Sequence, residues 1–434
     1  MRMFVDASKL TRTTKLAVWV LALALLSGCS PDAGYKSNLP YFHRFFRKEL
    51  SENDSRSERA AKETIAQQNR QDIANILATM FGTPDDPQLP ALGEVDLKSV
   101  IDINRVSMSA GKVKSDKSGQ PAGLYREHCV HCHGITGNGL GPTAAFLNPY
   151  PRDFRKGTFK FKKTAKGQKP THEDLSRLLY DGVAGTAMPS FKVLDADERE
   201  SLVHYVKYLS FRGEVERKLI EEIQELDEGD RLVKYPSEKE SDTGKYEAKL
   251  DRLRAIAAEV AQTWIDADGQ ATGIPERTPH ADSDAKKAAI ARGREIFYGP
   301  IANCVKCHGD SALGDGQLTD YDDWTKELDP DPKQIDMKAT HEYMALGALK
   351  PRNIRPRNLR LGIYRGGLTP NDIYWRVVNG IDGTPMPGLT MKPQNEKGLS
   401  PDDVWDLVEY VRSLPYEALN KPDSSQPTIA RDRM

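Results

Sequence analysis

The spacing of apolar residues predicts four amphipathic helices, within residues 56–81, 194–209, 246–264 and 399–414. In each segment apolar side chains recur every three or four positions, as one face of an α-helix requires. The pattern predicts a mainly α fold, with N-caps at Asp197 and at Ser400 or Asp402. The apolar stripes are Ile65, Ile73, Ile76, Leu77 and Met80; Leu202, Val203, Val206 and Leu209; Leu250, Leu253, Ile256, Ala257, Val260 and Trp264; and Val404, Leu407, Val408 and Val411.

The N-terminus has a different pattern, a basic start followed by one apolar run from Leu16 to Leu26. That run is shorter than the roughly 20 residues of a membrane-spanning helix, and it fits the hydrophobic region of an export signal. Residues 26–29, "LSGC", resemble the lipobox of bacterial lipoproteins. We therefore expect a signal peptide over residues 1–28 and lipidation of Cys29. The alternative is an ordinary cleaved signal that contains a cysteine.

The cysteines form a second pattern, because four of the five lie in two C-x-x-C-H motifs. Disulfides, a redox dithiol and a shared zinc ion are alternatives, but none of them explains a histidine after each pair. Covalent haem attachment explains all three residues of a motif, since two thiols form thioethers and the histidine ligates the iron from below. The motifs predict two covalently bound c-type haems, attached at Cys129 and Cys132, with His133 as ligand, and at Cys304 and Cys307, with His308 as ligand.

An internal repeat surrounds the two motifs. Residues 171–189 align without a gap with 369–387, and "PRDFRKGTF" (151–159) aligns with "PRNLRLGIY" (356–364). The closing stripes of 194–209 and 399–414 also match. Each unit thus contains a haem motif, a Pro-Arg loop, a short helix, a G-T-x-M-P loop and an amphipathic helix, which should pack against an N-terminal helix carrying the haem motif.

Each unit resembles a class I cytochrome c domain, and the chain resembles a diheme cytochrome c. The resemblance implies methionine as the sixth iron ligand, at Met188 and Met386, with Met391 as a rival in the second unit. It also implies that a proline carbonyl holds the proximal histidine, which points to Pro142 and, less directly, Pro356. Arg152 and Arg357, in the matched loops, are expected to contact haem propionates; as solvated turn residues they would have no such role.

The predicted organisation has two tandem class I cytochrome c-like domains, at 105–213 and 285–416, joined by a helical connector at 214–284. Residues 29–104 form an N-terminal extension with one helix, residues 30–55 are expected to be mostly disordered, and 417–434 form a disordered tail.

Two segments inside these domains are strongly charged. Residues 152–169 are rich in lysine and arginine, whereas the insertion 310–336 is rich in aspartate. Such runs are usually solvated. As opposed patches near two haems, they are also expected to steer different redox partners.

Together these patterns indicate an exported, lipid-anchored diheme cytochrome c on the periplasmic or cell-surface side of a bacterial membrane. Its expected role is electron transfer between redox proteins such as a respiratory complex, an oxidase or a dehydrogenase, rather than enzymatic catalysis. The alternatives are a diheme peroxidase, a haem subunit that exchanges no electrons with external partners, and a redox sensor. The net charge of −1 gives no reason to expect nucleic acid as a partner.

Overall fold

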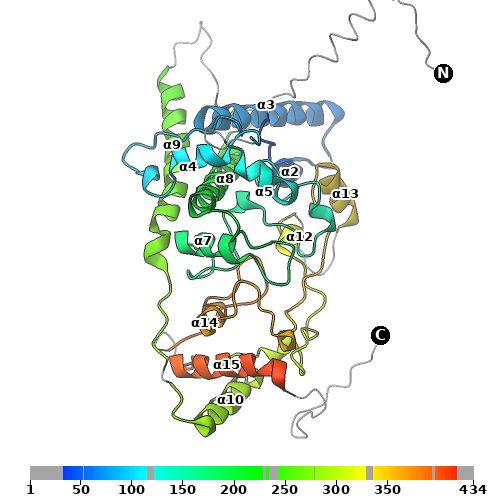
Figure 1. The fold of residues 1–434 in the computed structure, drawn as a ribbon. Helices are drawn as coiled ribbons and strands as arrows, with labels where there is room; N and C mark the ends of the chain where they lie inside the picture. The colour runs from blue at the N-terminus through cyan, green and yellow to red at the C-terminus, as the bar shows by residue number, and fades with distance from the viewer. Residues whose placement is uncertain are drawn as a thin grey trace, which may run out of the picture. The chain divides into compact units, whose positions relative to one another are not determined.

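Helices and loops make up the computed structural model, which describes residues 33–417 apart from 52, 115–121, 228–230, 234–242, 278, 329–335 and 393–395. Within these residues there are isolated β-bridges but no β-sheet, which confirms the prediction of a mainly α fold (Figure 1). The expected signal peptide, Cys29 and the tail from residue 418 onward lie outside the described residues. None of the described helices is both long and apolar enough to cross a bilayer.

The first repeat unit is built around the long helix α8 (Ala196–Glu222). The helix α4 (Ile103–Ser109) packs across it, and the stripe from Leu202 to Leu209 is buried between them. The N-cap of α8 is Asp195, which forms a capping box with Glu198, so the expected cap at Asp197 is wrong by two residues. The other elements of this unit are α5 (Leu124–His128), α6 (Val130–His133), η3 (Ala144–Phe146), η4 (Phe154–Lys156) and α7 (His172–Asp181).

The second unit repeats this arrangement with α10 (Ser283–Tyr298) packed across α15 (Pro401–Ser413), whose N-cap is Ser400. The two helices meet at Gly293, where an added Cβ would collide with the backbone of Asp406. Because α10 ends before Cys304, the helix that packs on the closing helix does not itself carry the haem motif, contrary to expectation. The remaining elements are α11 (Val305–His308), α12 (Asp323–Leu328), α13 (Met337–Ala345), η7 (Leu359–Leu361), α14 (Pro370–Asn379) and η8 (Leu414–Tyr416).

The short helices α7 and α14 explain why the repeat keeps a threonine, an aspartate and a glycine in register. Thr171 and Thr369 each begin a capping box with the aspartate three residues later. Each helix ends at a glycine with positive φ, Gly182 at 70° and Gly380 at 70°. The helix start and the sharp exit into the G-T-x-M-P loop are therefore set by the same residue types in both units.

The described residues of the N-terminal extension form helices α2 (Leu39–Glu49) and α3 (Arg56–Phe81), where one helix was expected. The predicted helix is α3, and the additional helix is α2, within the segment that was expected to be mostly disordered. Tertiary contacts fix α2: the Asn38 amide donates to Glu216 at 2.7 Å, and the Tyr41 hydroxyl donates to Glu221 at 2.7 Å. A short turn, η2 (Leu97–Ser99), follows before α4.

The connector is packed along the first unit. Helix α8 continues without a break past residue 213, and its C-terminal half buries Val215, Leu219 and Ile220. Helix α9 (Thr243–Ile265) lies against α8 and contributes its stripe, from Leu253 to Trp264, to the same core. The turns η5 (Ile223–Glu225) and η6 (Asp266–Gln270) end these two helices.

Candidate functional site

Each C-x-x-C-H motif forms one tight helical turn. In the first, the amides of Cys132 and His133 donate to the Cys129 carbonyl at 3.2 and 2.9 Å. In the second, the amides of Cys307 and His308 donate to the Cys304 carbonyl at 3.2 and 2.9 Å. The same two bonds thus hold both motifs, which present their thiols and imidazole in the same local arrangement.

The four motif cysteines are all free thiols in the structure, so the disulfide framework that the cysteine count allows is not formed. Burial raises the pKa of Cys129 and that of Cys304 to about 12. A buried thiol of this kind is uncharged at neutral pH, unlike the low-pKa cysteine of a typical redox dithiol. The geometry therefore favours a structural or attachment role for these pairs.

Each motif histidine is held by a backbone carbonyl through its Nδ1 atom. The His133 Nδ1–H donates to the Arg152 carbonyl at 3.1 Å, and the His308 Nδ1–H donates to the Arg357 carbonyl at 3.0 Å. A carbonyl can only accept, so the proton lies on Nδ1 and the lone pair lies on Nε2. This is the tautomer that an iron ligand needs, with the second hydrogen bond fixing the orientation of the ring.

These bonds correct one expectation. The carbonyl groups that hold the histidines belong to Arg152 and Arg357, not to Pro142 or Pro356. The two arginines occupy the same place in the matched Pro-Arg loops, so the repeat extends to this contact.

The surroundings keep both imidazoles neutral. Burial lowers the pKa of His133 to about 4, although the bond to the Arg152 carbonyl acts in the opposite direction. Burial also lowers the pKa of His308. The His133 ring stacks on Phe154, from η4, with ring centroids 4.5 Å apart and planes 14° from parallel. Neutral, oriented imidazoles can offer Nε2 to a metal over the whole physiological pH range.

The two G-T-x-M-P loops have the same internal hydrogen bonds. The Met188 amide donates to the Thr186 hydroxyl at 3.1 Å, and the Met386 amide donates to the Thr384 hydroxyl at 3.2 Å. Each methionine carbonyl in turn accepts an amide from the start of its loop, at 3.1 and 3.2 Å. Both methionines are half-buried. The rival Met391 packs against the second core and forms an isolated bridge with Leu399.

The side chains of Arg152 and Arg357 lie at the contact between the two units. The Arg152 guanidinium donates to Asp323, from α12, at 2.5 Å. The Arg357 Nε donates to the Ile363 carbonyl at 3.0 Å, and its terminal nitrogen lies against Gly185, in the methionine loop of the first unit. Asp323 lies in the same way against Gly383, in the methionine loop of the second. The second Pro-Arg loop therefore contacts the methionine loop of the first unit directly, whereas Arg152 is connected to the methionine loop of the second unit only through Asp323.

The basic segment 152–169 and the acidic insertion face each other. Lys160 pairs with Asp323 at 3.7 Å, and Lys156 pairs with Glu327 at 2.9 Å. Farther along the segment, Lys162 pairs with Asp382 at 2.9 Å. The expectation that these charges steer separate partners is wrong for these residues, because they neutralise one another across the contact. Asp329 and Asp331 lie outside the described residues.

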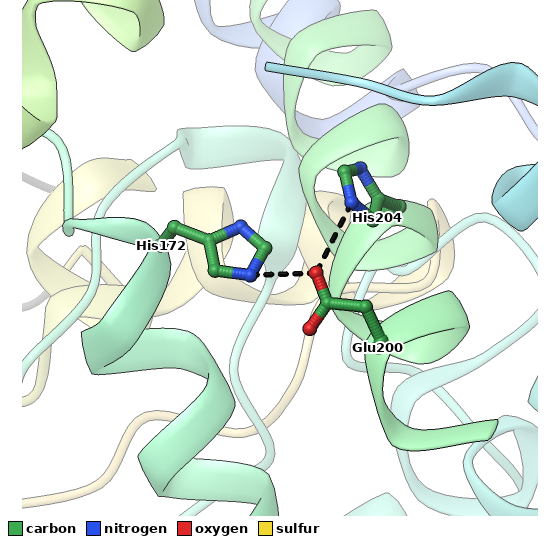
Figure 2. A group of neighbouring side chains, drawn as sticks. All are labelled: His172, Glu200 and His204. Atoms are coloured by element: carbon green, nitrogen blue, oxygen red, sulfur yellow. Dashed lines mark ion pairs between the residues drawn. The ribbon is translucent and has the colours of Figure 1, made fainter. Parts of the chain in front are cut away.

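Sequence reasoning missed a cluster of His172, Glu200 and His204, whose ligand-type atoms all lie within 4.8 Å of one another (Figure 2). Glu200 Oε1 lies 2.7 Å from His172 Nε2 and 3.3 Å from His204 Nε2. Glu200 and His204 are four residues apart on α8, a spacing that places them on one face, whereas His172 comes from α7.

The outer contacts of this cluster oppose metal binding. The Asp102 amide donates to His204 Nδ1 at 3.1 Å, and Lys207 Nζ lies 3.0 Å from His172 Nδ1. An amide can only donate, so the proton of the neutral His204 ring lies on Nε2 and points to Glu200. Metal-binding histidines show the opposite arrangement, with the outer nitrogen donating. The cluster is therefore a set of hydrogen bonds that connects α7 to α8.

Two family models match the chain. Residues 117–206 match the model described as "Cytochrome C oxidase, cbb3-type, subunit III", and residues 290–415 match the model described as "Cytochrome c". Among solved structures, a chain of the Kuenenia stuttgartiensis reducing HAO-like protein complex is 24% identical, with a TM-score of 0.42. That alignment covers 67% of this chain and 93% of the other. No curated protein is significantly similar to the chain.

Proposed function

Because the chain carries two cytochrome c domains, we propose that it is an electron-transfer protein with two covalently attached c-type haems. The observation that supports this most strongly is the repeated motif geometry, in which both histidines have Nδ1–H bonded to a carbonyl and Nε2 open. The four motif thiols are unpaired and fit thioether attachment. A bound haem would supply one-electron chemistry at its iron, and the residues of the chain would hold and tune it.

The residues assigned to this role are the same at both sites. Cys129 and Cys132 would attach the first haem, and His133 and Met188 would bind its iron. Cys304 and Cys307 would attach the second, and His308 and Met386 would bind its iron. Axial methionine raises the reduction potential relative to more basic ligand sets, and a site with both ligands in place changes little on electron transfer. The matching hydrogen bonds of the two methionine loops favour a carrier over a peroxidase, which needs an open position on one iron.

The contact between the domains supports transfer from one haem to the other. Ion pairs with partly or fully buried side chains hold the domains together, among them Arg152 with Asp323 and Lys162 with Asp382. A fixed separation lets one site receive an electron while the other delivers it. We propose that the external partners are redox proteins such as a respiratory complex, an oxidase or a dehydrogenase, and that the protein works outside the cytoplasm, tethered by lipid at Cys29.

Mass spectrometry of the mature protein should show two haem additions, since both motifs are complete and both are built alike. A variant with Cys304 and Cys307 changed to serine should keep one addition, at the first motif. A Cys29→Ser variant serves as control and should keep both. A single addition in the unchanged protein would contradict the model of two carriers.

Changing Cys29 to serine should release the protein from membranes, because the predicted lipid anchor requires the thiol. Membrane and soluble fractions are compared by immunoblotting, and haem content, read from the visible spectrum, should stay intact. Unchanged membrane association would show that another feature, such as a partner subunit or an uncleaved signal, holds the protein there.

A further inference from the structure

Four basic side chains gather where the two domains meet: Arg152 and Lys160 from the first, Arg357 and Arg365 from the second. They form two repeat-related pairs, because 152 to 357 and 160 to 365 are both separated by 205 positions. Burial and the nearby charges of Arg152 and Arg365 lower the pKa of Lys160 to about 8. Burial and the charge of Arg357 lower the pKa of Arg365. The geometry links the same residues: Arg152 and Lys160 share Asp323, and a Cβ added at Gly366, next to Arg365, would come within 2.6 Å of the Phe161 Cβ, next to Lys160.

The carboxylates around this cluster do not balance its charge. Asp323 forms ion pairs with Arg152 and Lys160, at 2.5 and 3.7 Å. Its neighbour Asp322 instead accepts the amide and hydroxyl of Thr325. Arg357 and Arg365 form no ion pair with any described residue.

Arg365 carries the clearest sign of a missing partner. Its Nε is buried and has no hydrogen-bond partner among the described residues. Leaving a buried donor without a hydrogen-bond partner is costly, and a guanidinium can bind a carboxylate or phosphate through two parallel hydrogen bonds. The cluster can therefore accept an anion at Arg365.

The position of the cluster indicates which anion this is. The backbones of Arg152 and Arg357 hold the two motif histidines. The side chain of Arg357 contacts the methionine loop of the first domain, and Asp323, the partner of Arg152, contacts that of the second. The cluster therefore lies beside the loops that carry the candidate ligands of both domains.

We propose that Lys160 and Arg365 bind carboxylates of the two haems at the domain contact, so that one shared cationic cluster serves both cofactors. This inference rests on the proposed function and adds two residues to the arginines identified from the sequence. A cation beside a haem carboxylate stabilises the less positive, ferrous iron. Because the cluster is shared, a change of charge at one haem changes the electrostatic potential at the other.

The test is a spectroelectrochemical titration of the full-length haem-loaded protein and of Arg365→Gln and Lys160→Gln variants. The matched control is Arg355→Gln, which removes an exposed arginine of the same segment. Loss of Arg365 should lower the ferrous-to-ferric ratio of at least one haem at a fixed potential by about tenfold, which corresponds to about 59 mV for a one-electron couple. The Arg365→Lys variant keeps the positive charge but cannot form two parallel hydrogen bonds to a carboxylate. Its reduction potential should therefore shift less than that of Arg365→Gln.

A second readout separates carboxylate binding from a structural role. Without Arg365 the haem carboxylate should titrate at higher pH, so the potential should become pH-dependent near neutrality, whereas Arg355→Gln should follow the unchanged protein. If the Arg365→Gln variant keeps two haems and its reduction potentials are unchanged, the inference is overturned and the proposed function is left intact. Absence of haem from the unchanged protein would overturn the proposed function itself. A shift that disappears when inorganic phosphate is removed would assign the cluster to a free anion and overturn the inference.

Discussion

Replacing Asp323 with asparagine should destabilise the contact between the two domains by about 3 kcal/mol, the lower end of what breaking a buried ion pair costs. The side chain of Asp323 is 17% exposed and pairs with Arg152 and Lys160. Asparagine has nearly the same shape, so the change removes charge and little packing. Arg152 and Lys160 would then lose their ion-pair partner, and Lys156 would lose a nearby negative charge while keeping Glu327. Denaturant unfolding and limited proteolysis of the connector measure the effect.

The same aspartate predicts an acid dependence. Burial by itself would favour the neutral acid, but Arg152, Lys156 and Lys160 hold the pKa of Asp323 well below its usual range. A group whose folded pKa is depressed stabilises the protein fully above its unfolded pKa and loses that contribution as pH falls toward the folded value. The unchanged protein should therefore lose domain contact stability below about pH 4, and the Asp323→Asn variant should lack this part of the dependence.

The matched control is Asp320→Asn, in the same insertion. Asp320 pairs with Lys326 of its own segment, so its loss should leave the domain contact intact and cost no more than about 1 kcal/mol. Equal destabilisation by the two variants would show that the contact is not held by Asp323.

A Met188→Ala variant should lose one methionine-to-iron absorption band at the red end of the visible spectrum. A Met386→Ala variant should lose the other. The potential of the affected haem should fall by a sizeable part of the roughly 0.8 V range that axial ligands span, because methionine favours the ferrous state. The motif cysteines are unchanged, so both haems should remain attached. Visible spectra recorded during a redox titration report both effects.

The second domain provides its own control, since Met391→Ala removes the rival methionine. If Met391→Ala abolishes the band and Met386→Ala does not, the ligand of the second haem is Met391. Bands that survive all three substitutions would show that the G-T-x-M-P loops serve packing alone.

The parts of the structure that the sequence predicted well depend on local patterns. The closing helices and the matched Pro-Arg loops both follow from residue type and spacing. The short helices α7 and α14 are set by a threonine three residues before an aspartate, and this signal is present in both units. Helix α3 likewise begins and ends where its stripe and the following glycine predict.

The parts that the sequence did not predict depend on contacts between distant segments. Every residue has a carbonyl, so spacing could not show that Arg152, rather than Pro142, holds His133. The helix α2 depends on bonds to Glu216 and Glu221 on α8, far along the chain. Whether Lys160 faces solvent or Asp323 is also decided only by the packing of the domains. For Arg365 a signal did exist, because it occupies the repeat position of Lys160.

Each Pro-Arg loop places its arginine at the contact between the two domains, an arrangement of the kind found between the two halves of a homodimer, where one patch meets its own copy. In a homodimer both halves have one sequence, so every charge on one side has a twin on the other. Within a single chain the halves can diverge, and here Asp323 and the helix α12 belong to the acidic insertion of the second domain, whereas the basic segment belongs to the Pro-Arg loop of the first. The two proposed iron sites would thus lie in unequal electrostatic surroundings, which would give the two haems different reduction potentials.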